Sequence, residues 1–273
     1  RIMSRVIAIA NQKGGVSKTT TTVNLGIGLA RKGKKVLVID ADPQSSLTES
    51  LGFHQTDQLE VTLSSIMEKI MEDREVGKTE GILHHAEGID LLPCNIELSG
   101  MEVSIINAMS RETIMKRYID QMRESYDYIL IDCMPSLGML TINAFAASDS
   151  VLIPVQAAYL PVRGLEQLIM TISRVKKHIN PTIHFEGILI SMVDSRTVYA
   201  REIIELVKEN YGESLRIFDT MIPFSVRAAE TSAAGISIYQ LYPEHKVAKA
   251  YEDLTGEVIA SAHCGRKGGD GNE

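Results

Sequence analysis

The chain of 273 residues contains no tryptophan, 5% aromatic residues and only three cysteines. Cys94, Cys133 and Cys264 are odd in number and far apart, so the sequence indicates neither a disulfide framework nor a zinc site. No apolar run is long enough to cross a bilayer. The formal net charge of −7 also argues against a generally basic nucleic-acid-binding surface. These absences favour an ordinary globular protein of a reducing compartment, in which any DNA contact comes from a local patch.

A glycine-rich turn between an apolar strand and a helix is the most informative stretch. The turn is Asn11-Gln12-Lys13-Gly14-Gly15-Val16-Ser17-Lys18-Thr19-Thr20, between strand residues 6–10 and helix residues 19–31. Backbone N–H groups of such a loop point at an anion, and the helix N-terminus adds partial positive charge. We expect Lys18 to reach the outer phosphates of a nucleotide and the Thr19 hydroxyl to ligate Mg²⁺. The expected nucleotide-binding residues are Gly14, Gly15, Val16, Ser17, Lys18, Thr19 and Thr20.

The turn departs from the ordinary phosphate-loop pattern in ways that indicate a family. Gln12 replaces the first glycine, and Lys13 lies five residues before Lys18. The run K-G-G-V-x-K-T-T resembles the deviant Walker A motif of the ParA/MinD family of dimeric ATPases. The resemblance implies that Lys13 reaches the nucleotide of the partner subunit. Ser17 stands where the family has glycine, and a positive φ at this serine would cost about 1 kcal/mol.

Two further stretches place carboxylates at the ends of apolar strands. Val36 to Ile39 is followed by Asp40-Ala41-Asp42-Pro43-Gln44, and Tyr126 to Ile131 is followed by Asp132. Ligands bind at the carboxyl ends of strands in open α/β sheets. By resemblance Asp42 orients the attacking water, Asp40 supports Mg²⁺, and Asp132 is the Walker B carboxylate near Mg²⁺. The alternative for Asp42 is a simple capping Asp-Pro turn.

The rest of the chain alternates between strand and helix patterns. We expect helices over residues 62–71, 101–124, 199–211 and 244–262, and strands over residues 89–93, 151–155, 185–193 and 217–222. Met109 is expected to be buried in the second of these helices. This alternation predicts a doubly wound, mostly parallel sheet with helices on both faces. We expect one ATPase domain over residues 1–264 and a disordered polar tail over residues 265–273.

Arginines after two late strands suggest a DNA contact. Arg196 and Arg227 match, by resemblance, DNA-contacting positions of chromosomal ParA proteins, and Arg201 would extend the patch. Such a patch binds DNA without sequence preference and weakens with salt. Surface arginines are more often merely solvated, and that alternative stays open. By resemblance the backbone around Pro223 also lies near the adenine, while Phe224 replaces a family arginine.

The resemblance implies a partition ATPase that forms a homodimer with ATP, binds DNA nonspecifically and is released when a ParB-like protein stimulates hydrolysis. Because the phosphate-loop strand comes at the start of the chain, we expect the short form without a preceding DNA-binding domain. ATP or ADP and Mg²⁺ are the expected ligands, and the expected location is the nucleoid in the cytoplasm.

Three alternative functions remain open. A MinD-like membrane regulator is disfavoured because the last expected helix carries Glu252, Asp253 and Glu257 on its polar face, which an anionic bilayer would repel. An ATPase that positions another cargo would share every residue discussed. A nitrogenase-reductase-like electron carrier would need paired cysteines around an iron–sulfur cluster.

His84-His85 lacks partners at ligand spacing, so we expect surface residues there.

Overall fold

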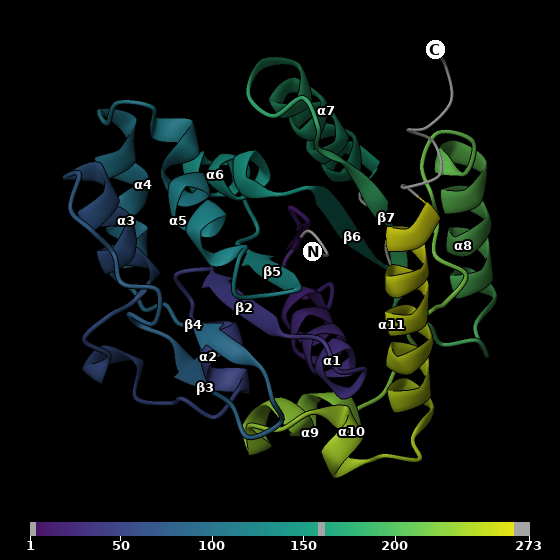
Figure 1. Ribbon diagram of the computed structural model, residues 1–273. Coiled ribbons are helices and arrows are strands. Elements are labelled where there is room, and N and C mark those ends of the chain that lie inside the picture. Colours follow the sequence, from purple (N-terminus) through teal and green to yellow (C-terminus); the bar gives the residue numbers. More distant parts are fainter. Residues whose placement is uncertain (1–3, 158–161, 265–273) are drawn as a thin grey trace.

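A seven-stranded sheet forms the centre of the protein in the computed structural model, which describes residues 4–157 and 162–264 (Figure 1). The strand order is β3-β4-β2-β5-β1-β6-β7. All neighbouring strands pair in parallel except β3 and β4, which pair antiparallel at one edge. The strands are β1 (Arg5–Ile9), β2 (Val36–Ala41), β3 (Leu83–His84), β4 (Asp90–Leu92), β5 (Tyr128–Cys133), β6 (Ser150–Gln156) and β7 (His184–Ser191).

Helices cover both faces of the sheet, which confirms the doubly wound prediction (Figure 1). Side chains of β1 alternate between two cores, with Val6 and Ala8 in one and Ile7 and Ile9 in the other. Helices α3 to α8 pack on the first face, and α1, α2, α10 and α11 on the second. The helices are α1 (Lys18–Arg31), α2 (Ser46–Ser50), α3 (Leu63–Met71), α4 (Leu98–Ile106), α5 (Ile114–Met122), α6 (Met139–Ala147), α7 (Val162–His178), α8 (Val198–Tyr211), α9 (Arg227–Ala234), α10 (Ile238–Leu241) and α11 (Lys246–Cys264).

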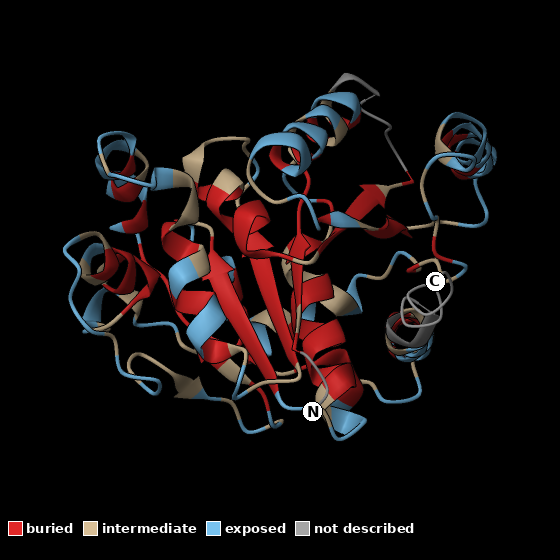
Figure 2. Ribbon diagram, turned by 45° about the horizontal axis from the view of Figure 1, so that its top comes forward, coloured by how far each residue is buried: buried red, intermediate tan, exposed pale blue. Residues whose placement is uncertain are grey.

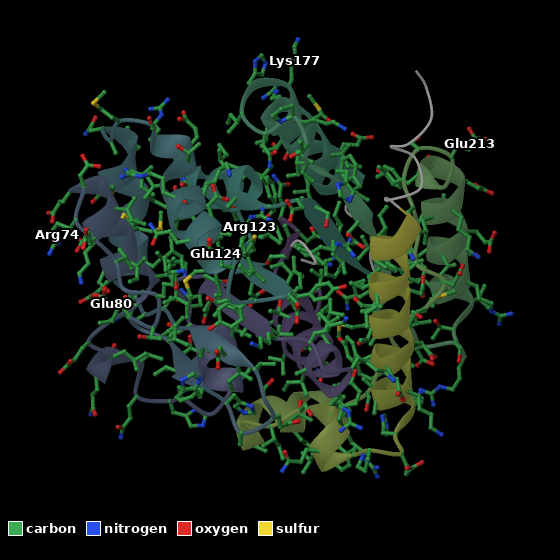
Figure 3. The ribbon with its side chains drawn as sticks, in the orientation of Figure 1. Arg74, Glu80, Arg123, Glu124, Lys177 and Glu213 are labelled. Atoms are coloured by element: carbon green, nitrogen blue, oxygen red, sulfur yellow. The ribbon has the colours of Figure 1, made fainter. Side chains whose placement is uncertain are left out.

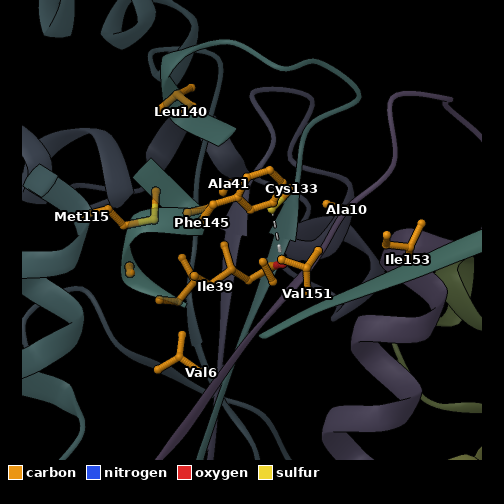
Figure 4. Close-up of a cluster of buried hydrophobic side chains, with 14 of the residues drawn as sticks. Val6, Ala10, Ile39, Ala41, Met115, Cys133, Leu140, Phe145, Val151 and Ile153 are labelled. Atoms are coloured by element: carbon orange, nitrogen blue, oxygen red, sulfur yellow. Dashed lines mark hydrogen bonds between the residues drawn. The ribbon is translucent and has the colours of Figure 1, made fainter. Parts of the chain in front are cut away.

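The strands at the middle of the sheet are buried on both faces, as Figure 2 shows in red. Figure 4 shows part of the first core, where Phe145 of α6 lies beside Ala41 of β2 and Cys133 of β5. Cys133 lies in the same cluster, and its burial raises the pKa of the thiol. A buried thiol with a raised pKa is a poor nucleophile, which agrees with a packing role for this cysteine.

The expected single helix over residues 101–124 is wrong. The structure has two helices, α4 and α5, separated by the short 3-10 turn η2 (Arg111–Thr113). Asn143 of α6 holds this break, because its side chain donates to the Arg111 carbonyl (2.7 Å) and accepts from the Met115 amide (3.1 Å). The expected burial of Met109 is also wrong, since this side chain is 93% exposed beside the break.

The expected strand over residues 217–222 is also absent, and only two isolated bridges form, at Ile217 and Pro223. Glu257 of α11 explains the interruption. Its carboxylate accepts the Asp219 amide (3.1 Å) and the Thr220 amide (2.8 Å). The Phe218 and Ile222 amides on either side still donate to β7, at the Ile188 carbonyl (3.0 Å) and the Ile190 carbonyl (2.9 Å), so the interruption is confined to these two residues. Glu257 of α11 therefore competes with β7 for the backbone donors of this segment.

The last helix, α11, begins and ends two residues later than expected, and its apolar stripe is buried as expected. Val247, Tyr251, Leu254 and Val258 are all buried in the second core. Glu252 and Asp253 are exposed on the other side of the helix. Among the helices that the structure describes, none is long and apolar enough to span a membrane. The tail over residues 265–273 lies outside the described residues.

Charged side chains lie mostly at the periphery, as Lys177 and Glu213 do in Figure 3. Arg123 is an exception, because its guanidinium makes two 2.9 Å bonds to the Asp149 carboxylate and a 3.0 Å bond to the Ser4 carbonyl. Asp149 also accepts the Val6 amide at 2.7 Å. These bonds fasten the amino end of β1, so the loop at its carboxyl end starts from a fixed strand.

Candidate functional site

The loop between β1 and α1 has the backbone of an anion-binding turn. Gly15 has φ +73° and Ser17 has φ +66°, both in the left-handed region. The positive φ expected at Ser17 is therefore present, at a residue that carries a Cβ. Gly14 and Gly15 are exposed, whereas Val16 is buried, and its carbonyl accepts the Ser191 hydroxyl at 3.3 Å. The loop is thus anchored at Val16 and open at its glycines.

Lys18 and Thr19 begin α1 beneath this loop. The Lys18 side chain is buried, and its Nζ donates to the Lys13 carbonyl at 3.0 Å. The Thr19 hydroxyl donates to Asp132 Oδ2 at 2.6 Å. Burial lowers the pKa of Lys18, and the charges of Asp132 and Asp42 oppose that shift. Lys18, Thr19 and Asp132, which the sequence predicts for one site, are therefore close together, and their roles toward phosphate and Mg²⁺ stay predictions.

Two buried carboxylates lie side by side on adjacent strands. Asp40 of β2 and Asp132 of β5 occupy paired positions in the sheet. Burial raises the pKa of Asp132 to about 8, and repulsion from Asp40 adds to the rise. Burial also raises the pKa of Asp40 to about 6, despite hydrogen bonds from Thr48. Two like charges in a water-poor environment favour a cation beside them.

The donor set fits a Mg²⁺ ion that is held mainly by phosphates and water. Asp132 Oδ1 is buried without a hydrogen-bond partner, so one carboxylate oxygen is left for such a ligand or its water. The Thr19 hydroxyl is adjacent. Within residues 4–157 and 162–264, no group of three or more His, Cys, Asp or Glu could hold a metal by itself. Mg²⁺ at nucleotide sites typically needs only one or two protein ligands.

Asp40 differs from Asp42 and Asp132 because both of its carboxylate oxygens already accept hydrogen bonds within the protein. Oδ2 accepts the Thr48 amide (2.8 Å) and the Thr48 hydroxyl (2.7 Å), and Oδ1 accepts the Asp42 amide (3.2 Å). These bonds tie α2 and the Asp42 turn to β2. A supporting role of Asp40 near Mg²⁺ stays a prediction, while its contacts hold the backbone that carries Asp42.

Asp42 forms a turn and lines a cavity at the same time. Its Oδ1 accepts the Gln44 amide (3.0 Å), and its carbonyl accepts the Ser45 amide (2.8 Å). The buried Cys94 thiol donates to the same carbonyl at 2.7 Å. The Asp-Pro capping turn considered above is therefore present, and it directs the half-buried carboxylate toward the cavity.

The cavity has a volume of about 410 Å³ and joins the phosphate loop to the segment after Ile222. Pro223 lines it, and a position of this proline near the nucleotide base stays a prediction. Lys13 is not among the residues that line it. The described lining residues are Gly14, Gly15, Ser17, Lys18, Thr19, Thr20, Asp42, Ser46, Ser50, Pro135, Met192, Ile222, Pro223, Phe224, Ser225, Ala228, Ala229, Ser232, Val247 and Tyr251.

The sequence analysis did not identify more than half of the residues that line this cavity. Ser46 and Ser50 come from α2, Ala228 and Ser232 from α9, and Tyr251 from α11. These positions, four small residues and one tyrosine, belong to none of the sequence motifs. The two serines of α2 follow Asp42 closely in the chain, whereas the other three residues reach the cavity only because α9 and α11 return to this edge of the sheet. Met192 also lines the cavity, and its backbone has a strained φ of +54°. Only the structure shows this strain, so nothing in the sequence places Met192 in the site.

The three arginines of the expected DNA contact are all exposed, but they differ in surroundings. Arg196 makes a bidentate ion pair with Asp194, with N–O distances of 2.9 and 2.8 Å. This pair and the nearby Lys246 lower the pKa of Asp194 to about 2. Arg227 begins α9, and its guanidinium lies 4.9 Å from the centre of the Tyr242 ring. Arg201 lies on α8.

Lys246 joins this surface, and the sequence did not point to it. The pKa of His245 is lowered by burial and by the charges of Arg227 and Lys246. His245 directly precedes Lys246 in the chain, and its Nε2 lies 3.4 Å from the Ser225 hydroxyl, which accepts the Arg227 amide at 3.2 Å. The backbones of Val193 and Pro223 are also bridged, so the segments that lead to Arg196 and Arg227 leave from one point. The arrangement brings a small cationic group to the rim of the cavity that Ser225 lines.

Replacing Ser17 with glycine should raise the free energy of unfolding by about 1 kcal/mol, because glycine adopts a left-handed φ without strain. Urea denaturation of the nucleotide-free protein would measure the change. Ser46→Gly is the matched control, since Ser46 begins α2 without a positive φ. It should lower stability, and a similar loss in Ser17→Gly would contradict the strain at Ser17.

Comparison with known proteins agrees with this geometry. Residues 4–185 match the AAA domain family. The chain is 42% identical to the sporulation initiation inhibitor protein Soj of Bacillus subtilis strain 168, over 95% of this chain and 100% of that protein. It is 37% identical to the chromosome partitioning protein ParA of Caulobacter vibrioides, over 94% of each.

A solved structure is similar over nearly the whole chain. Cobyrinic acid a,c-diamide synthase from Mycobacterium smegmatis, with bound ADP and magnesium, is 35% identical and superimposes with a TM-score of 0.82, over 97% of this chain and 98% of that one. The sequence resemblance, the fold and these relatives agree. The chain belongs to the ParA/Soj family of P-loop ATPases.

Proposed function

We propose that the protein is a partition ATPase, which hydrolyses ATP to ADP and phosphate and couples this to the segregation of a plasmid, chromosome or mobile element. The observation that carries the proposal is the cavity where the phosphate loop, Asp42 and the Pro223 segment meet. Curated relatives named for chromosome partitioning support the biological role. The cofactor is Mg²⁺, and the nucleotides are ATP and ADP, which agrees with the ligands of the solved relative.

The proposed chemistry is in-line attack of water on the γ-phosphate. The loop amides and Lys18 hold the phosphates, and the buried Lys18 ammonium places positive charge in a water-poor environment. Thr19 and Asp132 would hold Mg²⁺, which neutralises charge on the phosphate oxygens when bound. Asp42 accepts a hydrogen bond from the attacking water and orients it. The nucleoside extends toward Pro223.

Lys13 is proposed to act on the nucleotide of a second copy of the chain. Its side chain does not line the cavity of its own subunit, although its carbonyl fixes Lys18 there. A lysine that completes the site only in a dimer would link ATP binding to self-association. The ATP-bound homodimer is the proposed DNA-binding form.

DNA contact is proposed at the surface of Arg227, Lys246, Arg196 and Arg201. Arg227 and Lys246 are the main contributors, because Arg196 is paired with Asp194 and must lose or share that pair to meet a phosphate. The site would contact phosphates without reading base sequence. A ParB-like protein is the proposed activator, and the proposed location is the nucleoid in the cytoplasm.

Three alternative functions differ from this proposal in their cargo, in the surface they act on or in their chemistry. A positioning ATPase for a protein assembly would use the same cavity. A MinD-like role is disfavoured because Glu252 and Asp253 are exposed on α11. The electron-carrier alternative lacks support among the described residues, since Cys94 and Cys133 are both buried, free thiols.

The first experiment is binding to nonspecific duplex DNA with ATP, ADP or no nucleotide over a series of salt concentrations. ATP-dependent binding that weakens with salt is the expected result. A protein that hydrolyses ATP and dimerises but ignores DNA at low salt would exclude the DNA-based function and leave the positioning of a membrane or protein cargo.

Arg227→Glu is expected to abolish DNA binding, with a loss of at least about tenfold in affinity at low salt, while ATP-dependent dimerisation is retained. The control is Lys177→Glu, which makes the same charge change on α7, far from α9 (Figures 1 and 3). Fluorescence anisotropy would measure DNA affinity, and light scattering the dimer. Loss of the dimer in Arg227→Glu would place Arg227 at the subunit interface instead.

A further inference from the structure

Glu102 of α4 makes an unusual contact with the beginning of α6. Its Oε2 accepts the Met139 amide and its Oε1 accepts the Leu140 amide, both at 3.0 Å. These are the first two residues of α6. The first amides of a helix lack partners within the helix, and they carry its positive dipole end. A carboxylate that reaches them from another helix therefore fixes the beginning of α6 relative to α4.

Gly138 provides independent evidence that this contact is built into the fold. A Cβ at this position would lie 2.7 Å from Glu102 Oε2 and 2.8 Å from Oε1. The backbone itself would accept a side chain, because φ is −73°. Glycine is therefore needed here only to leave room for the Glu102 carboxylate.

The contact lies at the end of the loop over residues 134–138, which begins directly after β5, the strand that carries Asp132. Pro135 of this loop lines the nucleotide cavity. Ser136 is bonded on both sides, since its hydroxyl accepts the Gly138 amide (3.1 Å) and its carbonyl accepts the Thr141 hydroxyl (2.7 Å). Its amide donates to the Met134 carbonyl (2.9 Å) across Pro135. The loop is short and internally bonded, so a shift at the beginning of α6 is passed on to Pro135.

We propose that Glu102 is a positioning residue for ATP hydrolysis, which fixes the beginning of α6 and thereby the loop over residues 134–138 beside the phosphates. The proposal rests on the proposed ATPase function. Glu102 does not line the nucleotide cavity, so it acts through the loop and contributes nothing to nucleotide affinity directly. Its loss should therefore lower kcat and leave the affinity for ATP unchanged.

The test uses Glu102→Ala, Gly138→Ala and the double variant in the full chain. Glu102→Ala should lower kcat about tenfold, because a small misplacement near the reacting groups reduces the rate strongly. Gly138→Ala should cause a similar loss, since its Cβ displaces the carboxylate. In the Glu102→Ala background Gly138→Ala should cost nothing more, because the obstacle is gone. Glu102→Gln, which keeps one acceptor oxygen, should recover part of the rate.

Three measurements separate positioning from a merely structural contribution. Phosphate release gives kcat, a fluorescent ATP analogue gives affinity, and hydrogen exchange reports the Met139 and Leu140 amides. Faster exchange with lower kcat and unchanged affinity supports the proposal. Glu97→Ala, an exposed acidic position beside α4, is the control and should change none of them.

Unchanged or increased kcat in Glu102→Ala would overturn the proposal, as would losses from Glu102→Ala and Gly138→Ala that simply multiply. Wild-type protein without ATP hydrolysis would instead refute the proposed function itself.

Discussion

Replacing Asp42 with alanine is expected to lower kcat for ATP hydrolysis by at least about 100-fold, the usual contribution of a positioned proton acceptor. The affinity for ATP should be retained, because the phosphate-holding groups are the loop amides and Lys18. If hydrolysis releases the DNA-bound dimer, this variant should remain on DNA with ATP. Phosphate release, nucleotide binding and the lifetime of the DNA complex would measure the three effects.

Asp42→Asn distinguishes the chemical role of Asp42 from its structural role. The turn uses Asp42 Oδ1 as an acceptor for the Gln44 amide, and an asparagine oxygen can do the same. Asn should therefore keep the turn and still lose hydrolysis, because it lacks the carboxylate charge. Gln44→Ala is a suitable control, since the turn uses only the Gln44 backbone. Near-normal hydrolysis by Asp42→Asn would show that Asp42 acts only as the capping residue of the turn and not on the attacking water.

Local sequence predicts the part of the site that is built from single strand ends. The phosphate loop, Asp42 and Asp132 each follow an apolar strand, and parallel pairing of β1, β2 and β5 brings the three ends together. Periodicity also predicts the buried stripe of α11. In these cases the residues that determine the structure are neighbours in sequence.

The remaining features depend on contacts between residues far apart in the chain. Asn143 separates α4 from α5, and Glu257 keeps residues 219–220 off the sheet. The contact between Glu102 and α6 spans 37 residues and has no motif of its own. Thr48, which lies outside the motif, donates two hydrogen bonds to one carboxylate oxygen of Asp40. The sequence motif identifies this carboxylate but does not show that one of its oxygens is already bonded. Periodicity contains no information about these pairs.

Lys13→Ala is expected to lower kcat by at least about 100-fold, which is the usual loss when one charge-stabilising donor is removed. ATP affinity of the isolated subunit should change little. The reason is that Lys18 Nζ bonds the Lys13 carbonyl, and a backbone acceptor survives the substitution. Phosphate release and binding of a fluorescent ATP analogue would measure both quantities, with Gln12→Ala as the neighbouring control.

Mixing two inactive variants would show whether Lys13 acts across the dimer. In a mixed dimer of Lys13→Ala and Asp42→Ala subunits, the first subunit keeps its own Asp42 and receives Lys13 from its partner. If Lys13 acts in the partner's site, one of the two nucleotide sites of the mixed dimer is then complete. If Lys13 acts in the site of its own subunit, neither site is complete. With random pairing in a symmetric dimer, an equal mixture should recover about a quarter of the wild-type rate. No recovery, despite mixed dimers detected by differential tags, would assign Lys13 to its own nucleotide.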